Sequence, residues 1–352
     1  MRRILSFIFL AFSLAAGAQT MPTVLGETFP DTDGKHINCH GGNIIRADGK
    51  FYWYGEHRGE SQEGVACYSS DNLRDWKNEG IVLRVVDEPG ALLERGCTIE
   101  RPKVVYNPLT GKYVMWIHLE LKGRGYEAAF AGTATSDSPT GPFEFLGASR
   151  VNPGYYPMGE SERMRGMHYD PKLEWWTPEW RKTIEDGSMV VRDLPGGQMA
   201  RDMTVFVDDD QKAYHIYSSE DNLTLHVADL DSTYTRHTGV YSRIAPGGHN
   251  EAPTIFKRDG RYWLITSGCT GWAPNKARMM WADSIHGPWH QVESPFKGEG
   301  ADTTFGSQGT YILDLDGRLT FMADIWNPRN LADSRHLWLP IELTPDGPVI
   351  RR

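Results

Sequence analysis

One short pattern recurs five times along this chain: an apolar strand, a turn, a basic residue and then a second strand rich in aromatic or apolar residues. Strand, turn, strand is the pattern of a β-hairpin. The basic residues that mark the five copies are Lys50, Lys112, Lys212, Arg261 and Arg318. Short strands repeating about every 40–60 residues are typical of propeller blades. The repeat therefore predicts an all-β fold, a five-bladed β-propeller.

Only the gap between the second and third copies is long, and residues 150–197 read as an insertion there. We expect residues 19–352 to form one propeller domain interrupted by this segment. The insertion concentrates the aromatic residues Tyr155, Tyr156, Trp175, Trp176 and Trp180. Long insertions in compact folds are often functional. Two roles stay open from the sequence: a wall of the substrate cleft, or packing on the outer rim.

Each copy also carries one polar residue at the same point of its leading strand. It precedes the basic residue by 10 positions in four copies and by 12 in the other. The five residues are His40, Glu100, Asp202, Glu251 and Gln308. One such residue alone would be an ordinary polar group at a strand edge. Because leading strands line a propeller axis, five in phase predict a polar ring at one mouth of the central channel.

The first 18 residues have the pattern of a secretory signal peptide. Arg2 and Arg3 precede an apolar run over residues 4–16, and small residues stand before Gln19. The run is too short to span a bilayer comfortably. We therefore expect a secreted or periplasmic protein with no membrane span.

Net charge and cysteine content limit which macromolecules, metals or cofactors the protein is expected to bind. A net charge of −9 makes nucleic acid or an anionic membrane an unfavourable partner, and we expect a monomer. The four cysteines form no Cys-x-x-Cys pair and no Cys/His spacing suited to zinc. We expect structural cysteines, no metal site and no cofactor. The cysteines are Cys39, Cys67, Cys97 and Cys269.

The leading strands resemble those of glycoside hydrolase family 43, and the closer match is subfamily 24, the exo-β-1,3-galactanases. The resemblance rests on His40-Gly41-Gly42, Tyr54-Gly55-Glu56, Glu100-Arg101-Pro102-Lys103, Ser136 to Phe143, Arg201-Asp202-Met203, Asn250-Glu251-Ala252-Pro253 and Gly306-Ser307-Gln308-Gly309. It implies a secreted inverting enzyme that releases galactose from β-1,3-galactan, the backbone of arabinogalactan. Alternatives are a β-xylosidase or α-L-arabinofuranosidase of the same family, and a non-catalytic glycan-binding propeller.

Glycoside hydrolysis usually needs two carboxyl groups, one of them protonated near neutral pH. Glu251 opens a strand beside an aromatic-rich hairpin, which suits the general acid, and Asp202 is its expected negative neighbour. The resemblance implies the same two roles. It also implies that His40, Glu56, Tyr126, Asn222 and Thr270 bind sugar hydroxyls.

The base is less clear, because the first leading strand carries no carboxylate where most family members have an Asp. This absence also matches subfamily 24. Glu100 and Gln308 are the remaining candidates in phase. A carboxylate is the natural base, whereas an amide accepts a proton poorly. We expect Gln308 to hold the attacking water and Glu100 to supply negative charge to it.

Overall fold

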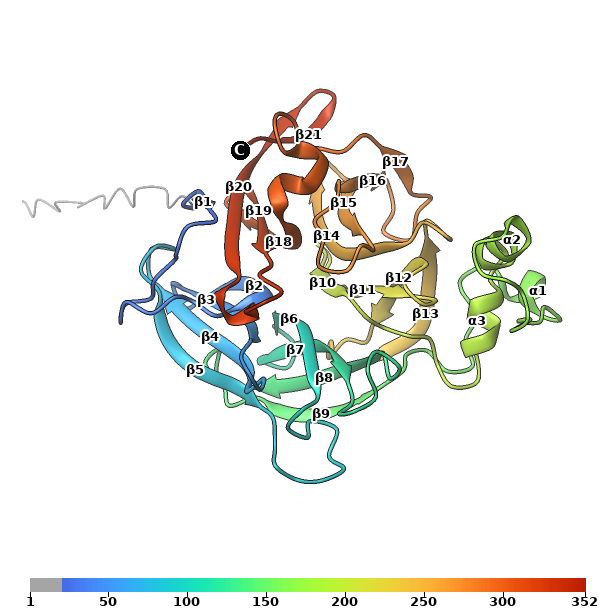
Figure 1. Ribbon diagram of the computed structural model, residues 1–352, viewed down its shortest axis with the longest axis horizontal. Coiled ribbons are helices and arrows are strands. Elements are labelled where there is room, and N and C mark those ends of the chain that lie inside the picture. Colours follow the sequence, from blue (N-terminus) through green and yellow to red (C-terminus); the bar gives the residue numbers. More distant parts are fainter. Residues whose placement is uncertain (1–20) are drawn as a thin grey trace, which may run out of the picture.

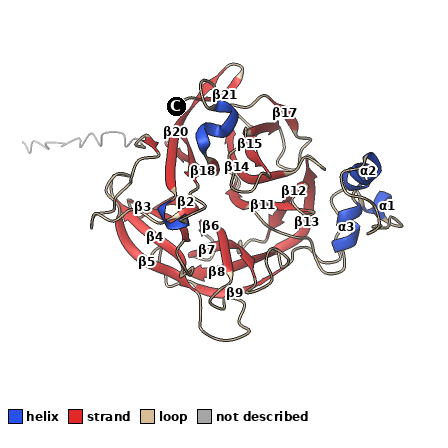
Figure 2. Ribbon diagram, in the orientation of Figure 1, coloured by secondary structure: helices blue, strands red, loops and turns tan. Residues whose placement is uncertain are grey.

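The computed structural model describes residues 21–352, so the predicted signal peptide lies outside the described residues. Five sheets surround a central axis, and the predicted five-bladed β-propeller is confirmed (Figures 1 and 2). Blade 1 contains β2 (His40–Ala47), β3 (Lys50–His57), β4 (Gly64–Ser70) and β5 (Lys77–Arg84). Blade 2 contains β6 (Thr98–Asn107), β7 (Lys112–Glu120), β8 (Phe130–Ser136) and β9 (Glu144–Ser149). Blade 3 contains β10 (Met203–Val207), β11 (Ala213–Ser219), β12 (Thr224–Leu230) and β13 (His237–Ile244).

Blade 4 contains β14 (Asn250–Arg258), β15 (Arg261–Gly268), β16 (Arg278–Ala282) and β17 (His290–Val292). Blade 5 contains β18 (Gln308–Leu315), β19 (Arg318–Ile325), β20 (Arg335–Thr344) and β1 (Val24–Leu25), with β21 (Gly347–Ile350) paired to β20. Two short 3-10 helices, η1 (Ala301–Gly306) and η2 (Leu331–Asp333), belong to loops. Four of the five basic residues begin the second strand of their blade, and Lys212 stands one residue before β11. The repeat therefore marks the inner hairpin of every blade.

The ring closes through the short strand β1, which the repeat did not indicate. Val24 pairs with Trp338 and Leu25 with Leu337, so β1 completes blade 5 from the opposite end of the described chain. Val24 is buried in a cluster between blades 5 and 1. In the same cluster Trp53 packs on Trp338 with ring centroids 4.8 Å apart. Such aromatic pairs contribute about 0.5–1.5 kcal/mol each beyond their area burial.

A β-bulge follows the in-phase polar residue in four leading strands. The antiparallel register shifts after His40, Glu100, Glu251 and, one residue later, Gln308. In the first three, the next residue has a left-handed backbone: φ is 64° at Gly41, 51° at Arg101 and 49° at Ala252. A bulge re-aims the neighbouring side chain and bends its strand. These strands thus turn their polar residues away from the regular alternation of the sheet.

The insertion forms three helices, α1 (Ser161–Met164), α2 (Pro178–Asp186) and α3 (Ser188–Asp193). They lie outside the ring beside β13, so packing on the outer rim is the alternative that the structure shows (Figure 1). Thr177 caps α2 by accepting a hydrogen bond from the Trp180 N–H, and left-handed Gly187 ends it. Trp180 and Ile184 bury the inner face of α2 against Leu223.

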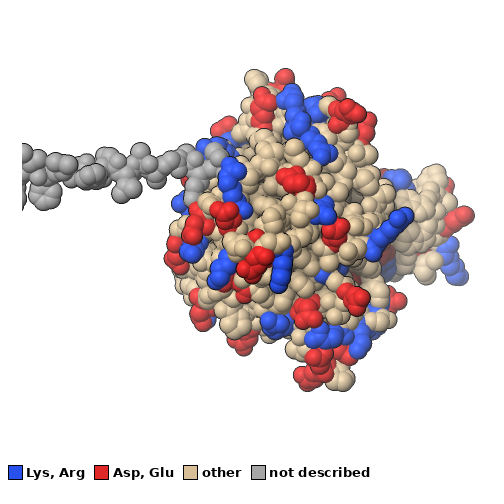
Figure 3. Space-filling view, turned by 60° about the vertical axis from the view of Figure 1, so that its left-hand side comes forward, with Lys and Arg blue, Asp and Glu red and all other residues tan. Residues whose placement is uncertain are grey.

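No described helix is long and apolar enough to cross a membrane. Figure 3 shows acidic and basic side chains interspersed over one face, without a large patch of either sign. The net charge of −9 is thus not gathered into one strong negative field on that face.

Candidate active site

A pocket of about 400 Å³ opens at the centre of the ring. Four of the five in-phase residues line it: Glu100, Asp202, Glu251 and Gln308. Glu56, Tyr126 and Asn222 join them from β3, the β7–β8 loop and the β11–β12 turn. The remaining lining residues are Arg58, Arg101, His118, Arg201, Gly271, Trp272 and Trp326.

Glu251 lies in an environment that suits a general acid. Burial and the nearby Asp202 carboxylate raise its pKa from 4.5 to about 7. Both causes disfavour the negative charge. The Asn222 amide donates to Glu251 Oε1 at 2.8 Å and fixes the carboxyl group in place. Glu251 can therefore hold a proton near neutral pH and face the pocket with it.

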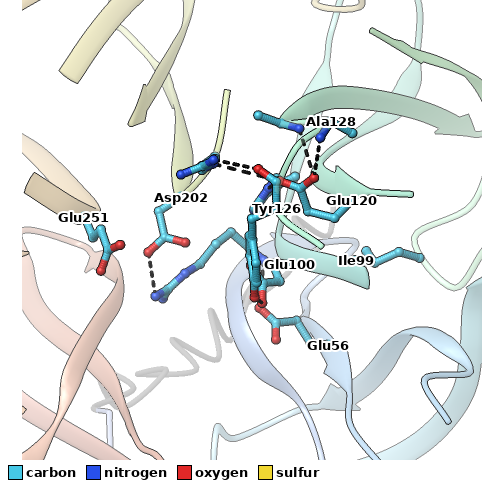
Figure 4. A network of polar contacts seen from close by, with 12 residues as sticks. Glu56, Ile99, Glu100, Glu120, Tyr126, Ala128, Asp202 and Glu251 are labelled. Atoms are coloured by element: carbon cyan, nitrogen blue, oxygen red, sulfur yellow. Dashed lines mark hydrogen bonds and ion pairs between the residues drawn. The ribbon is translucent and has the colours of Figure 1, made fainter. Parts of the chain in front are cut away.

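Asp202 and Gln308 are joined by the Arg101 guanidinium. Arg101 Nη2 lies 2.8 Å from Asp202 Oδ2 and 2.6 Å from Gln308 Oε1. Asp202 Oδ2 also accepts from the Ala252 N–H at 3.0 Å, which ties it to the strand that carries Glu251. Figure 4 shows Asp202 between Glu251 and Glu100. Asp202 is thus placed to act on Glu251 by charge while its own charge is paired.

The orientation of the Gln308 amide is fixed by its neighbours. Its oxygen accepts from Arg101 and, at 2.9 Å, from Trp326 Nε1, while its nitrogen donates to Ser267 Oγ at 3.0 Å. A reversed amide would place N–H groups against two donors. The two lone pairs of the oxygen are therefore both used, and one amide N–H is left.

Glu100 stands on the other side of Asp202 within a network of donors. Its Oε1 accepts from Arg58 at 3.0 Å and from the Tyr126 hydroxyl at 2.8 Å. Its Oε2 lies 3.2 Å from His118 Nδ1. Burial opposes ionisation, but the bond from His118 and the charge of Arg58 hold the pKa of Glu100 well below its usual range. Glu100 is therefore an ionised carboxylate.

His118 connects Glu100 to a second acid behind it. Its Nε2 lies 2.9 Å from Glu120 Oε1. Burial disfavours the imidazolium, but hydrogen bonds to the two carboxylates raise the pKa of His118 to about 9. Glu56, salt-bridged to Arg58, has a pKa raised by burial. Arg58 and His118 thus pair with the acidic groups of this wall, of which Figure 4 labels Glu56 and Glu100.

Two residues expected to bind sugar do not line the pocket. His40 is fully buried, and its Nδ1 lies 3.2 Å from Asp324, which also binds His336 and the Gly41 N–H. Burial lowers the pKa of His40 to about 4, so it is a neutral member of the core. The Thr270 hydroxyl donates to the Ala273 carbonyl at 2.5 Å within its own loop. Being in phase does not settle which way a side chain points after the bulge.

The repeat did not single out the cations and tryptophans of the pocket. Arg101 is not in phase with the five polar residues, yet its side chain carries two of the central contacts. Trp272 is 43% exposed and packs edge to face on Trp326 at 5.4 Å. Exposed aromatics beside a pocket are binding candidates. The position of Arg101, directly after the in-phase Glu100, could have indicated that it reaches the pocket. The tryptophans stand in loops and have no fixed place in the repeat, so no pattern indicates them.

Two groups of side chains have spacings that could hold a metal ion among the residues that the structure describes. They are His40 with Asp324 and His336, and Glu100 with His118 and Asp202. In the second, Arg58 and Arg101 already neutralise the carboxylates, and His118 is bonded on both sides. The four cysteines are all free. These donors are engaged with protein partners.

A β-propeller whose axial pocket sets a carboxyl group of raised pKa near ionised carboxylates has the features of a glycoside hydrolase. A model described as "Glycosyl hydrolases family 43" matches residues 174–323. A structure of a family 43 β-1,3-galactosidase with galactodeoxynojirimycin is 57% identical, with a TM-score of 0.92, covering 94% of this chain and 98% of that one. The chain belongs to glycosyl hydrolase family 43.

Two further structures are similar over most of this chain. An exo-β-1,3-galactanase from Clostridium thermocellum is 32% identical, with a TM-score of 0.75, covering 93% of this chain and 64% of that one. An exo-β-1,3-galactanase from Phanerochaete chrysosporium with β-1,3-galactotriose is 29% identical, with the same TM-score, covering 93% and 66%. The comparison with curated proteins found no match.

Proposed function

We propose that this protein is an inverting exo-β-1,3-galactanase that releases galactose from β-1,3-galactan of arabinogalactan and works after export from the cytoplasm. The observation that carries the proposal is the buried Glu251, with its pKa raised to about 7, at the mouth of the axis beside Asp202. The activities of the three similar proteins, a β-1,3-galactosidase and two exo-β-1,3-galactanases, support galactan as the substrate.

Glu251 acts as the general acid in this proposal. In its protonated form it donates to the glycosidic oxygen as the bond to the leaving sugar breaks, and the sugar ring gains oxocarbenium character. Asn222 keeps the carboxyl group oriented, and Asp202 keeps it protonated near neutral pH. The positive charge that develops on the ring is stabilised by the ionised carboxylates of the wall.

Glu100 and Gln308 act on the water side. The Gln308 oxygen is already bonded to Arg101 and Trp326, so it offers no lone pair to a water. The same two bonds disfavour an imidic acid tautomer, which would place a proton on that oxygen. Its remaining N–H can hold the water oxygen, and the ionised Glu100 can accept the water proton. In this way Gln308 positions the nucleophile and Glu100 is the base.

Product analysis after incubation with β-1,3-galactan, arabinan and xylan tests the proposal. We expect galactose as the first product, in the α-configuration when it is released, because inversion of a β-linkage gives the α-anomer. Xylose or arabinose as the main product would favour the family's β-xylosidase or α-L-arabinofuranosidase activities. Binding without any product would favour a glycan-binding propeller.

A further inference from the structure

The turn that carries Asn222 has an unfavourable backbone. Three successive residues without glycine, Glu220, Asp221 and Asn222, have φ of 52°, 55° and 66°. A left-handed backbone is unfavourable for a residue other than glycine and persists only where the surroundings hold it. This turn joins β11 to β12 and directs the Asn222 amide to Glu251 Oε1, 2.8 Å away.

The first two residues of the turn are held by arginines that link them to the insertion. Arg192 of α3 donates to Asp221 Oδ2 at 2.5 Å and to both oxygens of Asp193 at 2.8 Å. Arg243 of β13 makes two bonds of 2.8 Å to Glu220 and also donates to the Ile184 and Glu185 carbonyls of α2. Both arginines thus join the turn to the helices on the outer rim.

The insertion also touches the strand of the acid from a second direction. The Trp176 ring lies 5.4 Å from His249, two residues before Glu251. The His249 N–H in turn donates to the Leu223 carbonyl at 3.1 Å, directly after the strained turn. None of residues 150–197 lines the pocket, so the insertion acts on catalysis only indirectly, and the contacts of Arg192, Arg243 and Trp176 are its links to the strand and turn around Glu251.

We propose that the rim insertion is a positioning element for the general acid, with Arg192 acting through Asp221 and Asn222 on Glu251. The proposal rests on the proposed function, because it assigns the insertion to the acid step of that reaction. Without the contact from Arg192 the turn relaxes toward ordinary backbone angles, and Asn222 no longer holds the carboxyl group toward the glycosidic oxygen. The water side of the pocket, which Arg192 does not touch, keeps its geometry.

Arg192→Ala tests this with two substrates that need the acid to different degrees. We expect kcat/KM on β-1,3-galactobiose to fall at least tenfold, and kcat/KM on a dinitrophenyl β-galactoside to change less than about threefold, because a good leaving group needs little protonation. A merely structural loss would lower both by the same factor. Lys182→Ala is the matched control, since Lys182 lies in the same insertion and its ion pair in the described part of the chain is with Asp186 of its own helix at 2.7 Å.

Asn222→Ala and the double variant complete the test. We expect Asn222→Ala to show the same substrate dependence, and the double variant to be no worse than the poorer single variant, because both changes break one path. If Arg192→Ala does not fold, Asp221→Asn removes the charge of the pair and carries the same expectation.

Equal losses on both substrates, multiplied losses in the double variant, or an Arg192→Ala variant as active as Lys182→Ala would each overturn the positioning role. Activity of the parent protein on β-1,3-galactobiose is measured first. Its absence would count against the proposed function and not against the path from Arg192.

Discussion

At the scale of single residues, the site depends on how each charge is paired. Glu251 accepts a hydrogen bond from Asn222 and has no salt-bridge partner among residues 21–352, whereas Glu100 and Asp202 each accept from an arginine. Because desolvation penalises an unpaired charge, burial raises the pKa of Glu251, whereas Arg58 and His118 keep Glu100 ionised despite burial. The pairing of Arg58 with Glu100 and of Arg101 with Asp202 thus distinguishes these carboxylates from the general acid.

The raised pKa of Glu251 predicts a pH-dependent cost to stability. The folded pKa of about 7 exceeds the ordinary 4.5, so the folded state favours the protonated form. The contribution of protonated Glu251 to the free energy of unfolding is fully present below pH 4.5 and is lost as pH rises through about 7. The free energy of unfolding of Glu251→Gln should therefore exceed that of the parent by about 1–3 kcal/mol at pH 8. Near pH 4.5 the two proteins should be almost equally stable.

Urea denaturation at the two pH values measures this difference. Glu88→Gln, at an exposed position, serves as the control and should change neither value. A Glu251→Gln variant that is no more stable at pH 8 than the parent would contradict the raised pKa. The same substitution should lower galactan cleavage by about 10²–10⁴-fold, as loss of a general acid does.

The two water-side residues should respond differently to substitution. Glu100→Gln removes the only group that we assign to accept the water proton, so kcat should fall by about 10²–10⁴-fold. Azide, which needs no deprotonation, should restore turnover and give α-galactosyl azide. Gln308→Ala should lower kcat less than Glu100→Gln does. Its turnover should also respond less to azide, because Glu100 is still present to accept the water proton.

The two rates with and without azide are compared for both variants. Should Gln308→Ala respond to azide more strongly than Glu100→Gln, the assignments of base and water holder would be reversed.

At the scale of elements, the bulge after each in-phase residue limits what can replace it. Gly41 follows His40 with φ of 64°, and an added Cβ would collide with Glu56 Oε1. Glu56 also accepts from the Arg101 N–H at 2.8 Å. A side chain at Gly41 would therefore disturb the wall of the pocket through Glu56.

Gly41→Ala should lower kcat/KM strongly while lowering the free energy of unfolding only modestly. Gly49→Ala is a matched control, because Gly49 has φ of 80° but open space around it. Both changes strain a left-handed backbone by of order 1 kcal/mol. Only Gly41→Ala should impair hydrolysis by tenfold or more, as measured by galactose release. Equal activity of the two variants would show that the contact with Glu56 is unimportant.

At the scale of the whole molecule, the propeller depends on the contact between its two ends. β1 holds blade 5 with only two residues, and Val24 alone of the two is buried, at 3% exposure against 41% for Leu25. A charge at Val24 would have no partner among the apolar residues of this cluster. Opening at this point would expose the tryptophans between blades 5 and 1.

Val24→Asp should lower the free energy of unfolding by about 3 kcal/mol or more, since it buries an unpaired charge. Leu25→Asp, on the neighbouring exposed position, should change it by about 0.5 kcal/mol or less. Thermal and urea denaturation of both variants measure the difference. Similar losses in the two would mean that the sheet pairing, and not the buried side chain, closes the ring.

The sequence by itself determined the five inner hairpins and the phase of their polar residues. Strand alternation and turns are local, so a basic residue at the start of β3, β7, β15 and β19 could be recognised without any distant contact. Phase along a repeat then carries over to position around the axis. Glu100, Asp202, Glu251 and Gln308 were identified in this way, and they line one pocket.

Only the tertiary structure decided the rest, because it depends on residues far apart in the chain. His40 was in phase, yet Asp324, 284 positions away, draws it into the core. The closure by β1 spans almost the whole chain, and a two-residue strand has no periodicity to reveal it. The pKa of Glu251 and the path from Arg192 arise from burial and charge pairing across blades, which no local pattern encodes.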